Sequence, residues 1–277
     1  MKKKIFLLIK ISRPIGWIVA PLVFLAGLHS SNAQLNFFSI FQLLMLSFPL
    51  CLAGYGINDI YDYESDRVNP RKKKIEGIVL KPKYHEFVKK SVFFMMFLLA
   101  LSSLITMNLT NIISMSMLLF FGYFYSAPPL RFKERPPLDS ISNGIIYFLA
   151  PFLLGHSFGG SIFAFSLKWL LITLFVAGIH SFSTVMDYSV DKKIKVKTFA
   201  VVFGKRSASF FALIMSLLAL VFGNFNTLIN YYLVFCGTIF FITLIHPSEK
   251  LASLFFKFIF IGFVLGAIAY IFLDFNF

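Results

Sequence analysis

Charged residues are scarce in this sequence, and acidic residues are the scarcest of them. Asp, Glu, Lys and Arg make up 14% of the 277 residues, and Asp and Glu together number only 12. Soluble domains have about a quarter of their residues charged. The shortage of charge therefore excludes an ordinary soluble domain and favours a chain that lies mostly in a membrane.

Cysteines are few, and the motifs of several enzyme classes are missing. The two cysteines, Cys51 and Cys236, both lie in apolar runs, which excludes a disulfide framework and indicates packing. The sequence has no Gly-rich phosphate loop, no cysteine cluster and no nucleophile motif, and its five histidines form no metal-site or haem-ligand pattern. Cofactor chemistry beyond a bound metal is therefore not indicated.

Apolar residues are abundant instead. They make up 58% of the chain, which contains 38 Phe and has a mean hydropathy of +0.81. A transmembrane helix needs roughly 20 mainly apolar residues. Runs close to that length are 15–30, 36–57, 91–109, 111–127, 139–159, 166–186, 207–223, 228–246 and 252–273. The sequence predicts an all-α polytopic membrane protein with nine transmembrane helices, in one domain that spans residues 1–277.

The first apolar run allows a second interpretation. Residues 1–33 combine a basic start, an apolar run and small residues, as a secretory signal does. Removal of such a signal would leave the rest of the topology unchanged.

Lys and Arg residues concentrate in alternate loops, and cytoplasmic loops retain these residues. All but Lys168 of the 26 fall in the N-terminal segment, in the loops after the second, fourth and sixth predicted spans, or beside the loop after the eighth. We therefore expect a cytoplasmic N-terminus and, after nine spans, an external C-terminus. Topology and contact with anionic lipid explain the net charge of +14, which is not a nucleic-acid signature.

Half of the acidic residues lie in two short clusters that close the second and sixth predicted spans. These residues are Asp59, Asp62, Glu64 and Asp66 in the first cluster, and Asp187 and Asp191 in the second. Asn58, Asp62 and Asp66 are four residues apart, which places them on one face of a helix. The second cluster repeats this step. Both clusters are predicted at the cytoplasmic ends of their spans, where they can meet across one bundle.

The clusters have the chemistry of a magnesium site. Like charges four residues apart repel one another on a helix, so we expect a cation between them. Mg²⁺ prefers a few carboxylates together with waters and substrate phosphates. Two facing acidic helix ends would therefore hold Mg²⁺ ions, and these ions would bind a diphosphate. The alternative is that each cluster is a solvated helix end that offsets nearby positive charge.

Basic residues follow both clusters and can neutralise the charge of a leaving diphosphate. Those predicted to bind substrate are Arg67, Arg71 and Lys72 after the first cluster and Lys192 after the second. The preference of cytoplasmic loops for bases explains each of them equally well.

The motifs resemble those of a known family. NDIYDYESD (58–66) resembles the first aspartate-rich motif, N-x-x-x-D-x-x-x-D, of the UbiA superfamily of intramembrane prenyltransferases, and DYSVD (187–191) resembles its second, D-x-x-x-D. The resemblance covers almost the whole chain and includes SRPIGW, NPRKKKIEG, YSAPPLRFKERPPLDS and VKTFAVVFGKR. The shared Arg-Pro start favours a retained first helix over a signal peptide.

This resemblance implies nine transmembrane helices around a central cavity, with both motifs near the cytoplasmic face binding Mg²⁺ and a prenyl diphosphate. It implies that Asn58, Asp62, Asp66, Asp187 and Asp191 are the metal ligands and the diphosphate site, and that the four aspartates are catalytic. It also implies that the loop after the fourth span lies near the phosphates; its candidate residues are Tyr125, Arg131 and Lys133. Asp59 and Glu64 are turned away from the shared helix face.

Within the superfamily, DYESDRVNPRKKKIEG and YSAPPLRFKERPPLDS most resemble the lycopene elongases, which prenylate carotenoids. Two positions depart from the family pattern. Ser189 stands where some members have an acid, and Val196 stands where a glycine often precedes the Lys-Thr pair. These departures predict a second metal site that is weaker or built differently.

The implied reaction is Mg²⁺-dependent transfer of a prenyl group from an allylic prenyl diphosphate to a hydrophobic acceptor in the membrane, such as lycopene. An aromatic acceptor (a quinone-precursor phenol) or haem is the alternative with the same fold. More remote alternatives are a transporter and a noncatalytic lipid-binding protein. The sequence indicates neither the prenyl chain length nor an oligomeric state.

Overall fold

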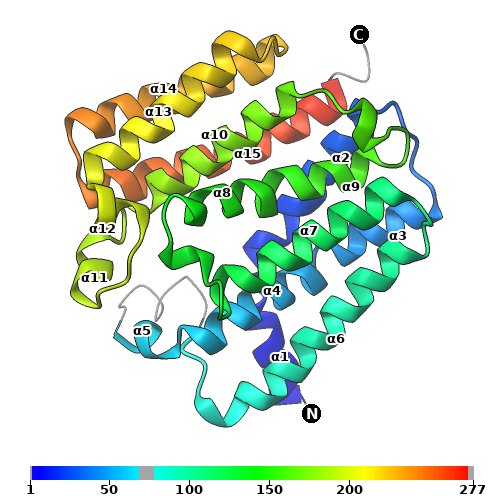
Figure 1. Ribbon diagram of the computed structural model, residues 1–277, viewed down its shortest axis with the longest axis horizontal. Helices are drawn as coiled ribbons and strands as arrows, with labels where there is room; N and C mark the ends of the chain where they lie inside the picture. The colour runs from blue at the N-terminus through cyan, green and yellow to red at the C-terminus, as the bar shows by residue number, and fades with distance from the viewer. Residues whose placement is uncertain (1, 69–77, 274–277) are drawn as a thin grey trace. The chain divides into compact units, whose positions relative to one another are not determined.

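The computed structural model describes residues 2–68 and 78–273, and the regular elements within them are all helical (Figure 1). The predicted all-α class is confirmed for this part of the chain. Contacts divide the fold into two compact units, Met1–Arg131 with Ala150–Phe163 and Phe132–Leu149 with Ala164–Phe277. The prediction that residues 1–277 form one domain stays a prediction.

The first unit contains most of the N-terminal half of the chain. Its helices are α1 (Lys2–Ile11), η1 (Pro14–Ile18), α2 (Val19–Ser30), α3 (Phe37–Met45), α4 (Phe48–Tyr61), α5 (Tyr63–Val68), η3 (Pro82–Tyr84), α6 (His85–Leu104), α7 (Leu109–Ser126) and α9 (Ala150–His156). The second unit contains η4 (Phe132–Glu134), α8 (Leu138–Gly144), η5 (Ile145–Leu149), α10 (Lys168–Ser183), α11 (Tyr188–Lys193), α12 (Phe199–Phe203), α13 (Lys205–Phe222), α14 (Thr227–Ile245) and α15 (Glu249–Leu273). The short η6 (Ile162–Ala164) lies where the chain leaves the first unit.

In the first unit, α2 and α9 approach one another closely through two glycines. A Cβ added at Gly27 would lie 2.0 Å from the carbonyl oxygen of Phe152, and one added at Gly155 would lie 1.9 Å from that of Phe24. Only residues without a side chain permit this approach.

A buried polar cluster joins α3, α6 and α7 in the same unit. The side-chain amides of Gln42 and Asn111 exchange two hydrogen bonds of 2.8 Å, and the amide of Asn111 also donates to the Ser157 hydroxyl at 2.8 Å. The Ser103 hydroxyl donates to Asn111 at 2.7 Å. In a membrane such groups must be satisfied internally, so the cluster fixes how these helices meet.

The second unit is built around α10. Its Gly178 lies against Ala212 of α13, and the Ser181 hydroxyl donates to the carbonyl of Ala208 at 2.9 Å. Phe182 is fully buried and packs on Phe240 of α14, with ring centroids 5.1 Å apart. Small residues and aromatic contacts such as this one thus hold α10 against its neighbours.

Two predicted spans contain breaks. The run 36–57 is divided into α3 and α4, which begins one residue before Pro49, a position where the missing N–H of proline costs no helix bond. In the run 139–159, the segment Ile145–Leu149 is π-helical, and Pro151 follows it. Proline removes a helix hydrogen bond, which accounts for the local change of helix type.

Most predicted spans have a counterpart among the described residues, which hold seven helices long and apolar enough to cross a membrane, or eight with a bent pair. The bent pair is Lys2–Ile11 with Pro14–Ser30, at 63°, and the sixth predicted span is the 16-residue α10. The third predicted span, 91–109, begins later than the helix that contains most of it, because α6 starts at His85. The chain is an integral membrane protein, while the count of nine helices and the central cavity stay predictions.

Candidate active site

The first acidic motif lies where α4 ends and α5 begins. The backbone at Asp62 departs slightly from helical geometry (φ −101°, ψ 6°), but its N–H donates to the carbonyl of Asn58 at 2.9 Å. The N–H of Asp66 in turn donates to the carbonyl of Asp62 at 2.8 Å. The four-residue step therefore continues through the junction, and all three side chains share one face.

Both carboxylates of this face are buried. Asp62 is 7% exposed and Asp66 is 5% exposed. The side-chain nitrogen of Asn58 donates to the hydroxyl of Ser126 at 3.1 Å, so its amide oxygen is the atom that can bind a cation. Ser126 is a buried residue at the end of α7 that sequence analysis did not single out. Because buried carboxylates are costly without positive charge, this face is suited to cations.

Arg131 supplies positive charge to the first motif. Its Nη2 lies 3.6 Å from Oδ1 of Asp62, and its Nη1 donates to the carbonyl of Ser126 at 3.4 Å. The residue has a left-handed backbone (φ 44°) in the loop after α7. The predicted base thus lies beside the first motif. Tyr125, predicted with it, is half-buried in the last turn of α7.

Asp59 has a different partner from the other motif acids. It is fully buried, and its Oδ1 lies 3.1 Å from Nη2 of Arg13. The Arg13 guanidinium also covers the ring of Tyr55 at 4.1 Å from the ring centroid. Arg13 takes a left-handed conformation (φ 50°) at the break between α1 and η1. This pair ties the start of the chain to α4 just ahead of Asp62, a link that sequence analysis missed.

The outer bases have contacts of their own. Arg67 lies 3.6 Å from Glu64 on α5, with both side chains well exposed, and Lys192 donates to the Tyr188 hydroxyl at 3.3 Å on α11. Arg71 and Lys72 lie outside the described residues. The role of all four bases in binding substrate stays a prediction.

The second motif repeats the local geometry of the first. Asp187 precedes α11 with φ −107° and ψ 5°, and the N–H of Asp191 donates to its carbonyl at 2.8 Å. The Thr198 hydroxyl donates to Oδ2 of Asp191 at 3.1 Å, and the N–H of Val196 donates to the Asp191 carbonyl at 2.9 Å. The loop after α11 therefore folds back onto the motif. Thr198, from the Lys-Thr pair, is a further site residue for which the sequence predicted no role.

Lys133 lies in the electrostatic field of the second motif. Burial of the half-buried side chain lowers the pKa of its ammonium group to about 8, while the charges of Glu134 and Asp191 oppose this change. A lysine with this pKa is mostly protonated at neutral pH but can lose its proton in mildly basic solution. Arg131 therefore lies beside an acid of the first motif and Lys133 is influenced by an acid of the second, while the role of both bases in binding substrate stays a prediction.

A buried carboxylate supports the loop that follows the second motif. Oδ2 of Asp139 accepts from the N–H of Phe199 at 3.0 Å, and its Oδ1 accepts from the N–H of Ser140 at 2.6 Å. Asp139 therefore accepts a hydrogen bond from the first backbone N–H of α12, which follows Thr198 directly. It is an acid outside both clusters, which is why the motif spacing did not reveal it.

The donor atoms of the two motifs fit a hard divalent cation. The first motif offers two carboxylates and one amide oxygen, and the second offers two carboxylates; Mg²⁺ favours such oxygen ligands. Within residues 2–68 and 78–273, no group of three His, Cys, Asp or Glu side chains forms a metal site. The shared face of the first motif presents two aspartates, as does the second motif, so a cation held by either would complete its coordination with water and phosphate.

Comparison with known proteins identifies the family. Residues 17–264 match the UbiA prenyltransferase family. The chain belongs to this family. This UbiA-family chain is 32% identical over 225 residues to a lycopene elongase/hydratase of Corynebacterium glutamicum, covering 80% of the chain and 77% of that protein. It is 27% identical over 278 residues to the digeranylgeranylglyceryl phosphate synthase of Methanocaldococcus jannaschii, covering 93% and 92%.

A solved structure agrees with this assignment. The UbiA homolog from Archaeoglobus fulgidus bound to DMAPP and Mg²⁺ matches with a TM-score of 0.71 at 21% identity, covering 96% of this chain and 99% of that one. The two chains therefore share a fold. As a UbiA-family prenyltransferase, this protein is an enzyme of the transferase class, as the resemblance of its motifs implied.

Proposed function

We propose that this enzyme transfers a prenyl group from an allylic prenyl diphosphate to a carotenoid acceptor, lycopene, within the membrane. The observation that carries the proposal is the buried face of Asn58, Asp62 and Asp66 with the Arg131 guanidinium against it. A diphosphate brings several negative charges into a membrane protein. It needs cations held by acids, together with fixed bases, at its binding site.

The residues of the chain have distinct roles in this reaction. Asp62 and Asp66 would hold a divalent cation together with the amide oxygen of Asn58, and Asp187 and Asp191 would offer the carboxylates of the second motif to such a cation. When bound, Mg²⁺ acts as a Lewis acid on the diphosphate and stabilises the charge of the departing oxygen.

The two bases of the loop after α7 act on the diphosphate. The Arg131 guanidinium binds its oxygens and limits their repulsion of the carboxylates. Lys133, protonated below a pKa of about 8, adds a second positive charge on the side of Asp191.

The allylic cation that forms must be protected from water. Aromatic faces can stabilise it by about 0.5–2 kcal/mol per contact.

The proposal of a carotenoid acceptor is supported by the C. glutamicum lycopene elongase/hydratase, one of several relatives of that name. The relative that makes digeranylgeranylglyceryl phosphate covers more of the chain at lower identity, so a lipid glycerol phosphate is the acceptor to test beside lycopene. We further propose that both motifs lie at the cytoplasmic face, because the basic loops flank them.

The test uses the purified full chain in lipid nanodiscs with Mg²⁺. Labelled dimethylallyl, geranyl, farnesyl or geranylgeranyl diphosphate is supplied with lycopene, 4-hydroxybenzoate, haem B or a geranylgeranylglyceryl phosphate, and products are separated by mass. We expect prenylated lycopene, and no product after chelation of the metal.

Three other results would change the account. Transfer to another acceptor would retain the reaction and replace the carotenoid. Transfer that persists without divalent metal would overturn the role of the acidic motifs. Absence of transfer to all four acceptors, with folded protein, would overturn the proposed substrates.

A further inference from the structure

The helix that carries the second motif has no fully buried residue. α11 has six residues, all of them described, and none is buried. A helix this short is not stable by itself, so tertiary contacts must fix its position. For α11 the contacts include polar ones, alongside the half-buried side chains of Tyr188 and Val190.

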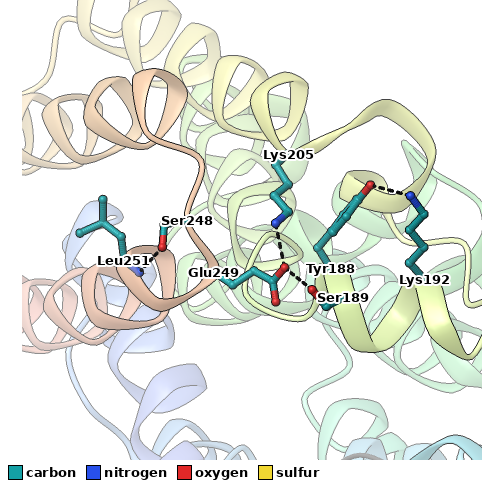
Figure 2. Close-up of polar contacts among 7 residues, drawn as sticks. All are labelled: Tyr188, Ser189, Lys192, Lys205, Ser248, Glu249 and Leu251. Atoms are coloured by element: carbon teal, nitrogen blue, oxygen red, sulfur yellow. Dashed lines mark hydrogen bonds and ion pairs between the residues drawn. The ribbon is translucent and has the colours of Figure 1, made fainter.

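Two charged residues from the starts of other helices contact α11. Oε1 of Glu249, the first residue of α15, accepts hydrogen bonds from the Ser189 hydroxyl at 2.5 Å and from Nζ of Lys205 at 2.8 Å (Figure 2). Lys205, the first residue of α13, also lies over the ring of Tyr188, 4.6 Å from its centroid. Two successive residues of α11 are therefore held by one acid–base pair.

The location of this contact connects it to the second motif. Ser189 lies between Asp187 and Asp191, so a displacement of Ser189 displaces both carboxylates. The Thr198 hydroxyl, from the loop after α11, donates a second hydrogen bond to the motif, at Asp191.

We propose that Glu249 is a positioning residue for the second acidic motif. Its carboxylate, oriented by Lys205, holds Ser189 and thereby fixes the spacing and direction of Asp187 and Asp191 toward the divalent cation. This inference rests on the proposed function, since it assigns the second motif to metal binding. Glu249 itself contacts no substrate in this account.

The test measures binding of Mn²⁺, as a spectroscopic substitute for Mg²⁺, to the purified full chain in the presence of inorganic pyrophosphate. The electron paramagnetic resonance signal of free Mn²⁺ reports the dissociation constant without any catalytic turnover. We expect Glu249→Ala to raise this constant by about tenfold, because removal of a group that orients a metal ligand weakens metal binding by this order.

Variants of the contacting residues test the route of the effect. Ser189→Ala deletes one exposed hydroxyl, is expected to fold, and should weaken Mn²⁺ binding in the same direction. The double variant Ser189→Ala, Glu249→Ala should lose no more than Glu249→Ala alone, since both act through one contact. Glu249→Gln retains an acceptor for Ser189 and should recover part of the loss.

Two matched controls separate this role from local structure. Ser248→Ala removes a hydroxyl that accepts from the N–H of Leu251 at the start of α15 but leaves Glu249 in place (Figure 2). Glu86→Ala removes an acid from an exposed pair with Lys90, 3.4 Å away in the first unit. Both variants should bind Mn²⁺ like the wild type.

Unchanged Mn²⁺ binding in Glu249→Ala and in Ser189→Ala would overturn the proposal, as would losses that multiply in the double variant. A wild-type protein that binds no Mn²⁺ with pyrophosphate would instead overturn the proposed function. The two failures are therefore distinguishable.

Discussion

The two acidic motifs have the same local backbone but different surroundings. In each, an aspartate with φ near −100° and ψ near 0° precedes a six-residue helix, and a second aspartate follows four residues later. The first motif is buried and has two arginines, Arg131 and Arg13, against its acids. The second is only half-buried and is held by hydroxyl groups and by the Lys205–Glu249 pair, in which each side chain is 26% exposed.

This difference indicates how each motif keeps its geometry. Burial and the guanidinium groups of Arg131 and Arg13 hold the acids of the first motif, because polar contacts are stronger where side chains are buried. The second motif depends on contacts that reach it from α12, α13 and α15. We therefore expect the first motif to tolerate substitution less well than the second.

Direct substitution of the motif acids should give the largest effects. Asp62→Asn removes the charge that both a divalent cation and Arg131 require, and we expect a loss of about a thousandfold in kcat/KM. Asp191→Asn should cost about a hundredfold, because the second motif is the more exposed. The measurement is prenyl transfer with labelled diphosphate. A larger loss in Asp191→Asn than in Asp62→Asn would reverse the comparison.

The pair of half-buried Arg13 and fully buried Asp59 should dominate the stability of the first motif. Arg13→Met removes the guanidinium from a fully buried carboxylate, which should lower the free energy of unfolding by about 3 kcal/mol. Thermal unfolding in detergent checks this loss. The matched double variant Arg13→Met, Asp59→Leu should regain most of it, because no buried charge is left. An unaltered unfolding midpoint in Arg13→Met would contradict this account of the pair.

The charge of Lys133 should make the second motif sensitive to pH. Because burial lowers the pKa of Lys133 to about 8, its positive charge is present below pH 8 and is lost as the pH rises through that value. We expect kcat/KM to fall across this range in the wild type. Lys133→Arg should shift the fall to higher pH, since a guanidinium remains protonated. An identical pH profile in both proteins would exclude Lys133 as the titrating group.

The lowered pKa of Lys133 also makes the folding stability depend on pH. Its folded value lies below the usual value of 10.5, so between about pH 8 and 10.5 the unfolded chain binds more protons. The contribution of Lys133 to folding stability therefore becomes more favourable as the pH rises through this window.

The exposed pair of Glu64 and Arg67 should give the smallest effect. Its charged atoms are 3.6 Å apart, and its side chains are 79% and 60% exposed. Exposed pairs contribute little, so Arg67→Gln should change KM for the prenyl diphosphate by no more than about twofold. A tenfold rise in KM would show that Arg67 contacts substrate and not only Glu64.

Local patterns made part of the site predictable. The four-residue spacing of Asn58, Asp62 and Asp66 depends only on helical periodicity, and the hydrogen bonds of the chain follow it. The loop that holds Arg131 and Lys133 was identified by its resemblance to the family. The apolar runs located most of the spans for the same reason, because length and hydropathy are local properties.

Contacts between distant residues could not be predicted in this way. Asn58 meets Ser126, Asp59 meets Arg13 and Ser189 meets Glu249 across long stretches of chain. These pairs depend on which helices pack together, and no spacing in the sequence encodes that. Helix breaks, such as the π-helical segment before Pro151, likewise depend on the balance between backbone bonds and packing.

The central claim is that two differently built motifs serve one reaction. Its most direct test is the rate of Mg²⁺-dependent prenyl transfer by the wild type, Asp62→Asn, Asp191→Asn and the double variant. Residues that act as a unit give non-additive losses, so the double variant should be no slower than Asp62→Asn alone. Losses that multiply, or an Asp191→Asn variant as active as the wild type, would contradict the claim.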